Sequence, residues 1–231
     1  MSTAPSSTGQ SSLDALISAG APQAVVFDCD GLLMDTEVIW ERSQNAVLAD
    51  HAIALPAAVA DALVGSSLED AAHRIADVGG VDELRVRREL RERFEQELET
   101  HGVRMLPGAE AVLRACAATV PVGVASNSWH EGLTEKLATA GLLDLFSTVQ
   151  STDTVARAKP APDMYVAAAA DLGAEPSQCL ALEDSVVGAG AALAAGLRLL
   201  AVPPSGVSID GAHGQVASLE DPALHRWIAS W

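Results

Sequence analysis

The stretch AVVFDCDGLLMDTE, residues Ala24–Glu37, decides how the rest of the chain is interpreted. Its first four residues are apolar and suit a short strand that is buried on both faces, as in a parallel sheet. Two acids, Asp28 and Asp30, follow at once. A carboxylate directly after a central strand is costly to desolvate without a partner. The stretch therefore predicts a reactive or ligand-binding site where the first strand ends.

Further short apolar runs have the length and flanks of buried parallel strands. Helical patterns lie between them, and several are followed by a glycine, which a left-handed C-cap favours. The predicted strands are 24–28, 121–126, 146–151, 179–183 and 197–202, and the predicted helices are 109–118, 131–140, 162–172 and 186–195. This alternation predicts an α/β fold, a doubly wound parallel sheet of the Rossmann-like kind.

The interval 36–105 breaks this alternation. Its segments LEDAAHRIADV (68–78) and VDELRVRRELRERFEQELET (81–100) carry apolar residues at helical spacing on otherwise charged faces. We therefore expect a helical cap domain over 36–105, inserted after the first strand and able to open and close as a unit. The remaining segments are a flexible N-terminal tail over 1–22 and an α/β core domain made of 23–35 and 106–231.

Composition restricts the partners and the compartment. The chain has 231 residues and a formal net charge of -17, which disfavours nucleic acid or an anionic membrane surface as a partner. Its three cysteines are widely spaced, so they suggest neither a disulfide framework nor a zinc site and fit a reducing cytoplasm. We find no signal-peptide pattern and no apolar run that could cross a bilayer. We expect a monomeric cytoplasmic protein.

Polar residues follow four of the predicted strands, at the sheet edge where such folds bind ligands. They are Asp28, Asp30, Ser126, Asn127, Lys159, Glu183, Asp184 and Ser185. Four carboxylates converging on one point repel each other unless a cation lies between them, and a hard divalent ion with oxygen ligands, above all Mg²⁺, suits them best. Beside such an ion a carboxylate can attack a phosphoryl group. The pattern therefore favours metal-dependent phosphoryl transfer.

Four motifs resemble those of the haloacid dehalogenase-like superfamily, in the same order. They are FDCDGLLMDTE (27–37), ASNS (125–128), KPAPDMY (159–165) and EDSVVGAGAALAAG (183–196). The chain looks most like the branch with a helical cap after the first motif, which includes β-phosphoglucomutase-like proteins and sugar-phosphate phosphatases. The resemblance spans 24 to about 202.

The resemblance implies a role for each matching residue. Asp28 matches the nucleophile that forms an aspartyl-phosphate, and Asp30 matches the general acid and base, whose backbone carbonyl also reaches the metal. Glu183 and Asp184 match the acids that complete the metal shell together with Asp28. The Ser126 hydroxyl and the Asn127 backbone N–H match the phosphate-binding positions, and Lys159 matches the catalytic cation that binds the phosphate and orients the nucleophile. Gly31 belongs to the phosphate-binding site, where it permits a tight turn.

The lysines narrow the function further. The chain has only Lys136 and Lys159, and neither lies in the insertion. This excludes a phosphonatase-like mechanism, which in this superfamily uses a cap lysine. It also weakens the mutase alternative, in which cap basic residues hold the far phosphate. Because haloacid dehalogenases need neither a second acid nor a metal, Asp30 argues for phosphoryl transfer.

We therefore expect a Mg²⁺-dependent phosphomonoester hydrolase that acts on a small phosphorylated metabolite, a sugar phosphate. A β-phosphoglucomutase-like hexose-phosphate mutase is the alternative. Two other classes stay open beside them. A phospho-accepting receiver module would be shorter and would lack the insertion, and a catalytically silent binding protein would have no need of intact acids and lysine.

Overall fold

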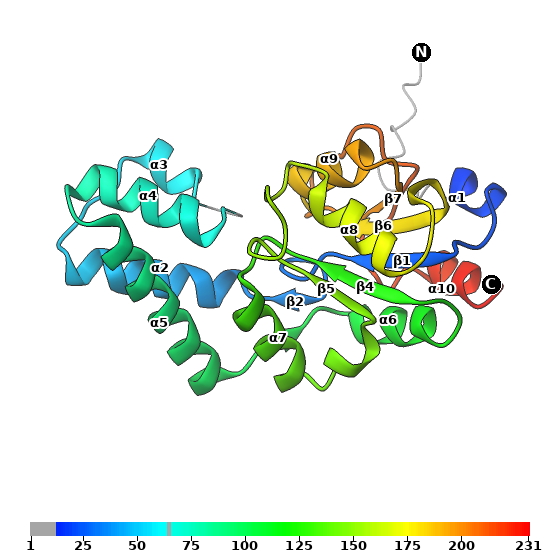
Figure 1. Ribbon diagram of the computed structural model, residues 1–231, viewed down its shortest axis with the longest axis horizontal. Helices are drawn as coiled ribbons and strands as arrows, with labels where there is room; N and C mark the ends of the chain where they lie inside the picture. Colours follow the sequence, from blue (N-terminus) through cyan, green and yellow to red (C-terminus); the bar gives the residue numbers. More distant parts are fainter. Residues whose placement is uncertain (1–12, 64–65) are drawn as a thin grey trace, which may run out of the picture.

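A computed structural model describes residues 13–63 and 66–231. Within these residues, six parallel strands form one sheet in the order β5-β4-β1-β6-β7-β8 (Figure 1). The strands are β1 (Ala24–Phe27), β4 (Val122–Ala125), β5 (Thr148–Gln150), β6 (Cys179–Glu183), β7 (Arg198–Ala201) and β8 (Gly214–Gln215). All five predicted strands are present, and the two-residue β8 was too short for its pattern to be recognised.

Helices cover both faces of this sheet (Figure 1). Val25 and Phe27 of β1 pack on the face shared with α1, α6, α7 and α10, whereas Ala24 and Val26 face α8 and α9. The helices are α1 (Asp14–Ser18), α6 (Ala109–Ala117), α7 (His130–Thr139), α8 (Asp163–Asp171), α9 (Val186–Ala194) and α10 (Pro222–Ile228). The alternating side chains of a strand buried on both faces explain this arrangement. The predicted doubly wound α/β fold is confirmed.

The prediction of a flexible tail over 1–22 is wrong for its last part. Helix α1 lies there, and Leu13 and Leu16 are buried in the same hydrophobic cluster as Val25 and Phe27. Burial of these two leucines offsets the entropy of ordering the segment. Residues 1–12 of the predicted tail lie outside the described residues.

The helical insertion predicted after the first strand is present. Its helices are α2 (Glu37–Asp50), α3 (Ala57–Asp61), α4 (Leu68–Gly79) and α5 (Glu83–His101). They share a hydrophobic cluster of their own, which includes Ile39, Ile75 and Leu90. Ser67 caps α4 and Asp82 caps α5, each by accepting a hydrogen bond from a backbone N–H in the first turn. None of the described helices has the length and apolarity needed to cross a membrane.

The two chain segments that join the insertion to the core lie side by side. The strands β2 (Met34–Asp35) and β3 (Arg104–Met105) pair in antiparallel fashion, with Met34 opposite Met105. Leu106 N donates to Leu33 O at 2.9 Å, and Arg104 forms an ion pair with Asp35. Opening and closing of the insertion about this pair of segments stays a prediction.

Candidate active site

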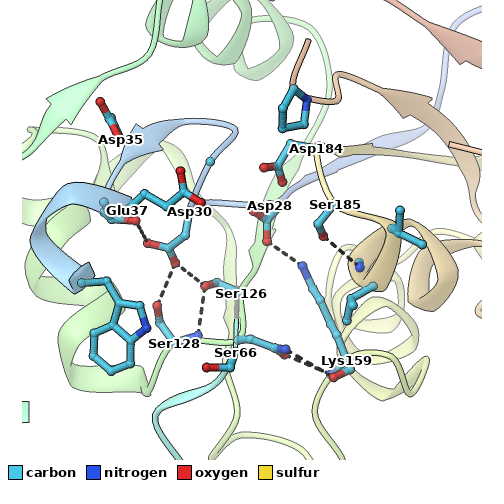
Figure 2. Close-up of a pocket in the computed structure, with 18 of the residues that line it drawn as sticks. Asp28, Asp30, Asp35, Glu37, Ser66, Ser126, Ser128, Lys159, Asp184 and Ser185 are labelled. Atoms are coloured by element: carbon cyan, nitrogen blue, oxygen red, sulfur yellow. Dashed lines mark hydrogen bonds and ion pairs between the residues drawn. The ribbon is translucent and has the colours of Figure 1, made fainter. Parts of the chain in front are cut away.

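The polar residues of the four motifs meet where the order of the strands reverses. β1 lies between β4 and β6, and Phe27 pairs with Val124 on one side and Leu182 on the other. In open α/β sheets, ligands bind in the crevice at such a switch point, beyond the carboxyl ends of the strands. A cavity of about 460 Å³ lies there, lined by Asp28, Asp30, Ser126, Lys159 and Asp184 from the core and by Trp40, Leu68 and Phe94 from the insertion (Figure 2).

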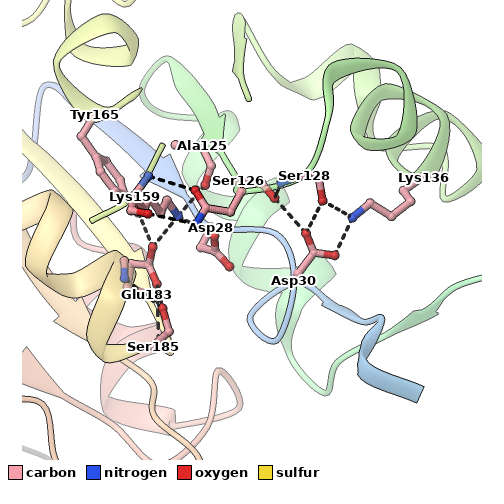
Figure 3. A network of polar contacts seen from close by, with 12 residues as sticks. Asp28, Asp30, Ala125, Ser126, Ser128, Lys136, Lys159, Tyr165, Glu183 and Ser185 are labelled. Atoms are coloured by element: carbon pink, nitrogen blue, oxygen red, sulfur yellow. Dashed lines mark hydrogen bonds and ion pairs between the residues drawn. The ribbon is translucent and has the colours of Figure 1, made fainter. Parts of the chain in front are cut away.

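Lys159 binds the two most deeply placed acids at once. Its Nζ donates to Asp28 Oδ1 at 2.6 Å, to Glu183 Oε1 at 2.6 Å and to Ala125 O at 2.8 Å (Figure 3). Burial opposes its charge, but attraction to Asp28 and Glu183 outweighs this effect and raises the pKa of Lys159 well above its usual value. The ammonium therefore stays charged in a buried position.

Three acids place carboxylate oxygens within 4.8 Å of one another: Asp28, Glu183 and Asp184. Burial raises the pKa of Asp28 well above its usual value although Lys159 opposes this shift, and the neighbouring acids add to it. Burial, reinforced by Glu183, raises the pKa of Asp184 to about 7. Asp184 Oδ1 is buried and has no hydrogen-bond partner among the described residues. Crowded carboxylates with an unpartnered buried oxygen fit a hard divalent cation such as Mg²⁺.

Gly31 lies against one of these acids. A Cβ at this position would be 2.2 Å from Asp184 Oδ2, and the backbone has a φ of +90°. Both the close approach and the positive φ require glycine. Gly31 thus leaves room for the Asp184 carboxylate.

Glu183 is held by hydrogen bonds on both of its oxygens. Lys159 and the Tyr165 hydroxyl each donate to Oε1 at 2.6 Å, and Ser185 Oγ donates to Oε2 at 3.1 Å. Helix α9 also passes close by, since a Cβ at Gly188 would lie 1.8 Å from Oε1. Glu183 therefore fixes the position of Lys159 as well as adding a negative charge to the acid cluster.

Asp30 lies on the other side of the site from Lys159, so the expected convergence of four carboxylates is wrong for this side chain (Figure 3). Its Oδ2 accepts hydrogen bonds from Ser126 Oγ and Ser128 Oγ, both at 2.8 Å. Its Oδ1 accepts from Thr36 Oγ1 and from Lys136 Nζ, both at 2.5 Å. The carboxylate turns this way because a second ammonium and three hydroxyls meet it there.

These donors also set the ionisation of Asp30. Burial alone would raise its pKa, but the charge of Lys136 and the hydrogen bonds from Lys136, Thr36 and Ser128 hold this pKa well below its usual value. The carboxylate is therefore ionised at neutral pH. The ionised carboxylate is the form that can take up a proton during a reaction.

Ser126 and Asn127 are both engaged within the protein. The Ser126 hydroxyl donates to Asp30, and the Asn127 side chain bonds the backbone of Lys159, accepting from its N–H at 3.0 Å and donating to its carbonyl at 3.3 Å. Asn127 thus fixes the loop that carries Lys159. The expected phosphate-binding roles of these two residues stay predictions.

Sequence reasoning missed several residues of this network: Thr36, Ser128, Lys136 and Tyr165. Lys136 had a visible signal, because it lies three residues after Leu133 and directly before Leu137 on the buried side of α7. A lysine within the apolar stripe of a helix needs a buried partner. Tyr165 lies within the third motif, but nothing in the spacing showed that its hydroxyl meets Glu183.

Comparison with known proteins identifies the family. The sequence model for the family described as haloacid dehalogenase-like hydrolase matches residues 25–202. The chain belongs to this family. The predicted superfamily is confirmed, and with it the assignment of the chain as a haloacid dehalogenase-like phosphatase, an enzyme.

This haloacid dehalogenase-like hydrolase is similar to two known relatives and to one solved structure. It is 35% identical to YhcW of Bacillus subtilis, a candidate phosphatase, over 78% of this chain and 83% of the relative. It is 31% identical to hexitol phosphatase B of Escherichia coli, again over 78% and 83%. CbbY of Rhodobacter sphaeroides, solved in complex with phosphate, has the same fold, with a TM-score of 0.77 at 24% identity over 87% of this chain and 96% of that one.

Proposed function

We propose that the protein is a Mg²⁺-dependent phosphomonoester hydrolase that acts on a small sugar phosphate through an aspartyl-phosphate at Asp28. The observation that carries this proposal is the position of Asp28. Its carboxylate is buried at the floor of the cavity, bonded to Lys159 and close to Glu183 and Asp184. A carboxylate in that position meets the requirements of a nucleophile toward phosphorus, with a cation beside it to neutralise the phosphoryl oxygens.

Asp28 and Asp184 would hold the metal, with Glu183 as a further carboxylate and the Asp30 backbone carbonyl as another oxygen. The unpartnered Asp184 Oδ1 supports this assignment. When bound, Mg²⁺ supplies positive charge that lets the acids stay ionised together and offsets the charge of a phosphoryl group. The Asp30 carboxylate would not bind the metal and would transfer protons instead.

The reaction then has two halves. In the first, an Asp28 oxygen attacks phosphorus, the bond from phosphorus to the leaving oxygen breaks, and Asp30 in its protonated form gives the leaving alcohol a proton. In the second, Asp30 takes a proton from water as the water oxygen attacks phosphorus, and the bond to Asp28 breaks to release inorganic phosphate. Asp30 is ionised in the free protein, which is the form that the second half needs, whereas the first half needs its carboxyl protonated before the ester bond breaks.

The lining of the cavity favours hydrolysis over the mutase alternative. Of the described lining residues, only Lys159 is basic, and it is already bonded to Asp28 and Glu183. Asp35 and Glu37 also line the cavity, and their charge would repel a second phosphate. The apolar lining includes Trp40, Phe94 and Trp129. A substrate with one phosphate and an uncharged remainder fits this lining better than a bisphosphate.

The proposal also includes what the protein binds and where in the cell it is found. The net charge of -17 supports a small phosphorylated molecule as the partner, with neither nucleic acid nor a membrane surface involved. We propose a monomer in the cytoplasm. Gel filtration of the pure protein tests the first of these points, and cell fractionation tests the second.

The proposal is tested by phosphate release from a panel of phosphomonoesters, with p-nitrophenyl phosphate as a general substrate. Sugar monophosphates should be hydrolysed, sugar bisphosphates should be poor substrates, and removal of metal with EDTA should abolish both reactions. Asp28→Asn should lose turnover and covalent phosphate together, because an amide cannot form an acyl phosphate. Turnover by Asp28→Asn, or conversion of a hexose 1-phosphate to its 6-phosphate with no release of phosphate, would refute the hydrolase mechanism.

A further inference from the structure

Lys136 supplies a second buried ammonium in the site, and the reaction proposed above gives it no role. It lies on α7 with 1% of its side chain exposed, and it is one of two lysines in the chain. Its Nζ donates to Asp30 Oδ1 at 2.5 Å and to Ser128 Oγ at 2.9 Å. Figure 3 shows it on the opposite side of Asp28 and Asp30 from Lys159. Each of these two acids therefore has a buried ammonium of its own.

Packing alone does not account for this lysine. The neighbours of Lys136 on the buried side of α7 are Leu133 and Leu137, and an apolar residue of similar length would fill the same space. Taking an ammonium out of water costs several kcal/mol, and a buried ion pair is often no more stabilising than a well-packed apolar pair. Because packing does not explain the buried charge of Lys136, we infer that the charge has a function.

Lys136 belongs to a closed ring of donors around one carboxylate. The Ser128 hydroxyl accepts from Lys136 Nζ and donates to Asp30 Oδ2, so the lysine bonds one oxygen directly and orients the donor to the other. Ser128 N also donates to Ser126 Oγ at 3.1 Å, which orients the second hydroxyl on Oδ2. A carboxylate held on both oxygens by such a network cannot rotate freely.

The insertion covers the ammonium. Lys136 Nζ lies 5.7 Å from the centre of the Phe94 ring of α5, and Phe94 in turn packs edge to face against Trp129 at 5.3 Å. The face of the Phe94 ring attracts the cation, and only 1% of the Lys136 side chain is exposed to water. The Lys136 ammonium therefore lies between the core and the insertion, while 31% of the Asp30 side chain stays exposed toward the cavity.

We propose that Lys136 is a positioning residue that holds Asp30 in the orientation from which it takes a proton from the attacking water. This inference rests on the proposed function, because it takes Asp30 as the general acid and base. Lys136 bonds Asp30 and has no contact with Asp28. Its removal should therefore slow the hydrolysis of the aspartyl-phosphate more than the formation of this intermediate from an ester with a good leaving group, which needs little protonation.

The test compares Lys136→Met with Arg91→Met in single-turnover experiments on p-nitrophenyl phosphate. Arg91 is a matched control, because it is a cation at the same contact between α5 and α7, lying over Trp129 at 5.5 Å and paired with Glu131, and it does not touch Asp30. Release of p-nitrophenolate reports formation of the phosphoenzyme, and mass spectrometry of acid-quenched samples reports its decay.

In Lys136→Met, we expect the burst of p-nitrophenolate to keep its rate within about threefold, while decay of the phosphoenzyme slows by about 10- to 100-fold, part of the usual contribution of a placed acid and base. Phosphorylated protein should accumulate, kcat should fall, and Arg91→Met should behave like the unchanged protein. Lys136→Arg should restore part of the decay rate. Ser128→Ala leaves Lys136 in place and should slow the same step. This second variant therefore tests the proposal even if Lys136→Met does not fold.

The outcomes separate the two proposals. If Asp28→Asn keeps turnover, the proposed function itself fails. If Asp30→Asn accumulates phosphoenzyme but folded Lys136→Met and Ser128→Ala turn over normally, the proposed function stands and the role of Lys136 is wrong. Equal slowing of formation and decay in Lys136→Met would likewise overturn the positioning role, since it would indicate a general disturbance of the site.

Discussion

Lys159 and Asp28 form an ion pair at the centre of the site, with Nζ 2.6 Å from Oδ1 and with 3% and 9% of the two side chains exposed. The same ammonium bonds Glu183, whose side chain is fully buried. One cation thus serves two buried acids, and neither acid has another basic side chain within bonding distance among the described residues. Both the stability and the activity of the protein should therefore depend on Lys159.

Replacing Lys159 by methionine should lower both properties. Removing one partner of a buried ion pair typically costs about 3–5 kcal/mol, because the remaining charge is left unpaired. Urea unfolding measures this loss, and the rate with p-nitrophenyl phosphate should fall by at least about 100-fold with the loss of charge stabilisation. Saturating Mg²⁺ should recover part of the stability and little of the rate. An active, fully stable Lys159→Met protein would contradict the central place of this pair.

Mg²⁺ affinity should rise with pH between about 6 and 8. The pKa of Asp184 is about 7, so below this pH its carboxyl holds a proton that the metal must displace, and above it the ligand is already free. One displaced proton corresponds to roughly a tenfold loss of affinity for each pH unit below 7. Calorimetric titration in buffers of different ionisation enthalpy measures both the affinity and the protons released. A pH-independent affinity over this range would show that Mg²⁺ displaces no proton from Asp184.

Asp184 and Glu183 should respond differently to loss of charge. Asp184→Asn changes a carboxylate with an unpartnered oxygen, so it should weaken Mg²⁺ binding strongly with little effect on folding. Glu183→Gln disturbs hydrogen bonds to Lys159, Tyr165 and Ser185, so it should lower the melting temperature more, and it should cost about 10- to 100-fold in metal affinity or activity, as for residues that orient a ligand set. The reverse ranking of melting temperatures would contradict this division.

Gly31→Ala should inactivate the enzyme through a single methyl group. The new Cβ would lie 2.2 Å from Asp184 Oδ2 at a φ of +90°, so the turn or the acid must move. Gly190→Ala in α9 is the matched control, because a Cβ there meets no atom within 4 Å. It should raise the free energy of unfolding by about 0.4–1 kcal/mol and leave activity unchanged. Equal activity of the two variants would argue against the close fit of Gly31 and Asp184.

The cluster of Asp28, Glu183 and Asp184 could be predicted because sheet topology brings these acids together, whereas Lys159 was placed by the family resemblance. Asp28 and Glu183 end or follow strands that the apolar runs of the sequence identify, and the carboxyl ends of parallel strands share one edge. Asp30 could not be placed in this way. It lies beyond β1, where the turn at Gly31 sets the direction of its side chain, and its strongest partner comes from a helix.

The residues that were missed come from helix faces and loops. Lys136 reaches Asp30 from α7 and Tyr165 reaches Glu183 from α8, and both contacts depend on how these helices pack on the sheet. The short helix α1 was missed because a run of five residues is too short to show a helical period, although Leu13 and Leu16 supply buried contacts. Local patterns identify elements, whereas contacts between elements require the packed structure.

The pairing of β2 with β3 would allow the insertion to be replaced without disturbing the six-stranded sheet. The segments by which the chain enters and leaves the insertion are the paired strands β2 and β3, with Asp35 opposite Arg104. A tight hairpin turn between these two residues would therefore close the core without moving its strands. No residue between 36 and 103 belongs to a strand of the six-stranded sheet, within the described residues. Asp28, Lys159, Glu183 and Asp184 would keep their supporting strands and loops through such a replacement. A different insertion could therefore join the core at the same two chain ends and leave the acid cluster in place, but it would have to supply its own partners for Asp30 and Lys136 in place of Thr36 and Phe94.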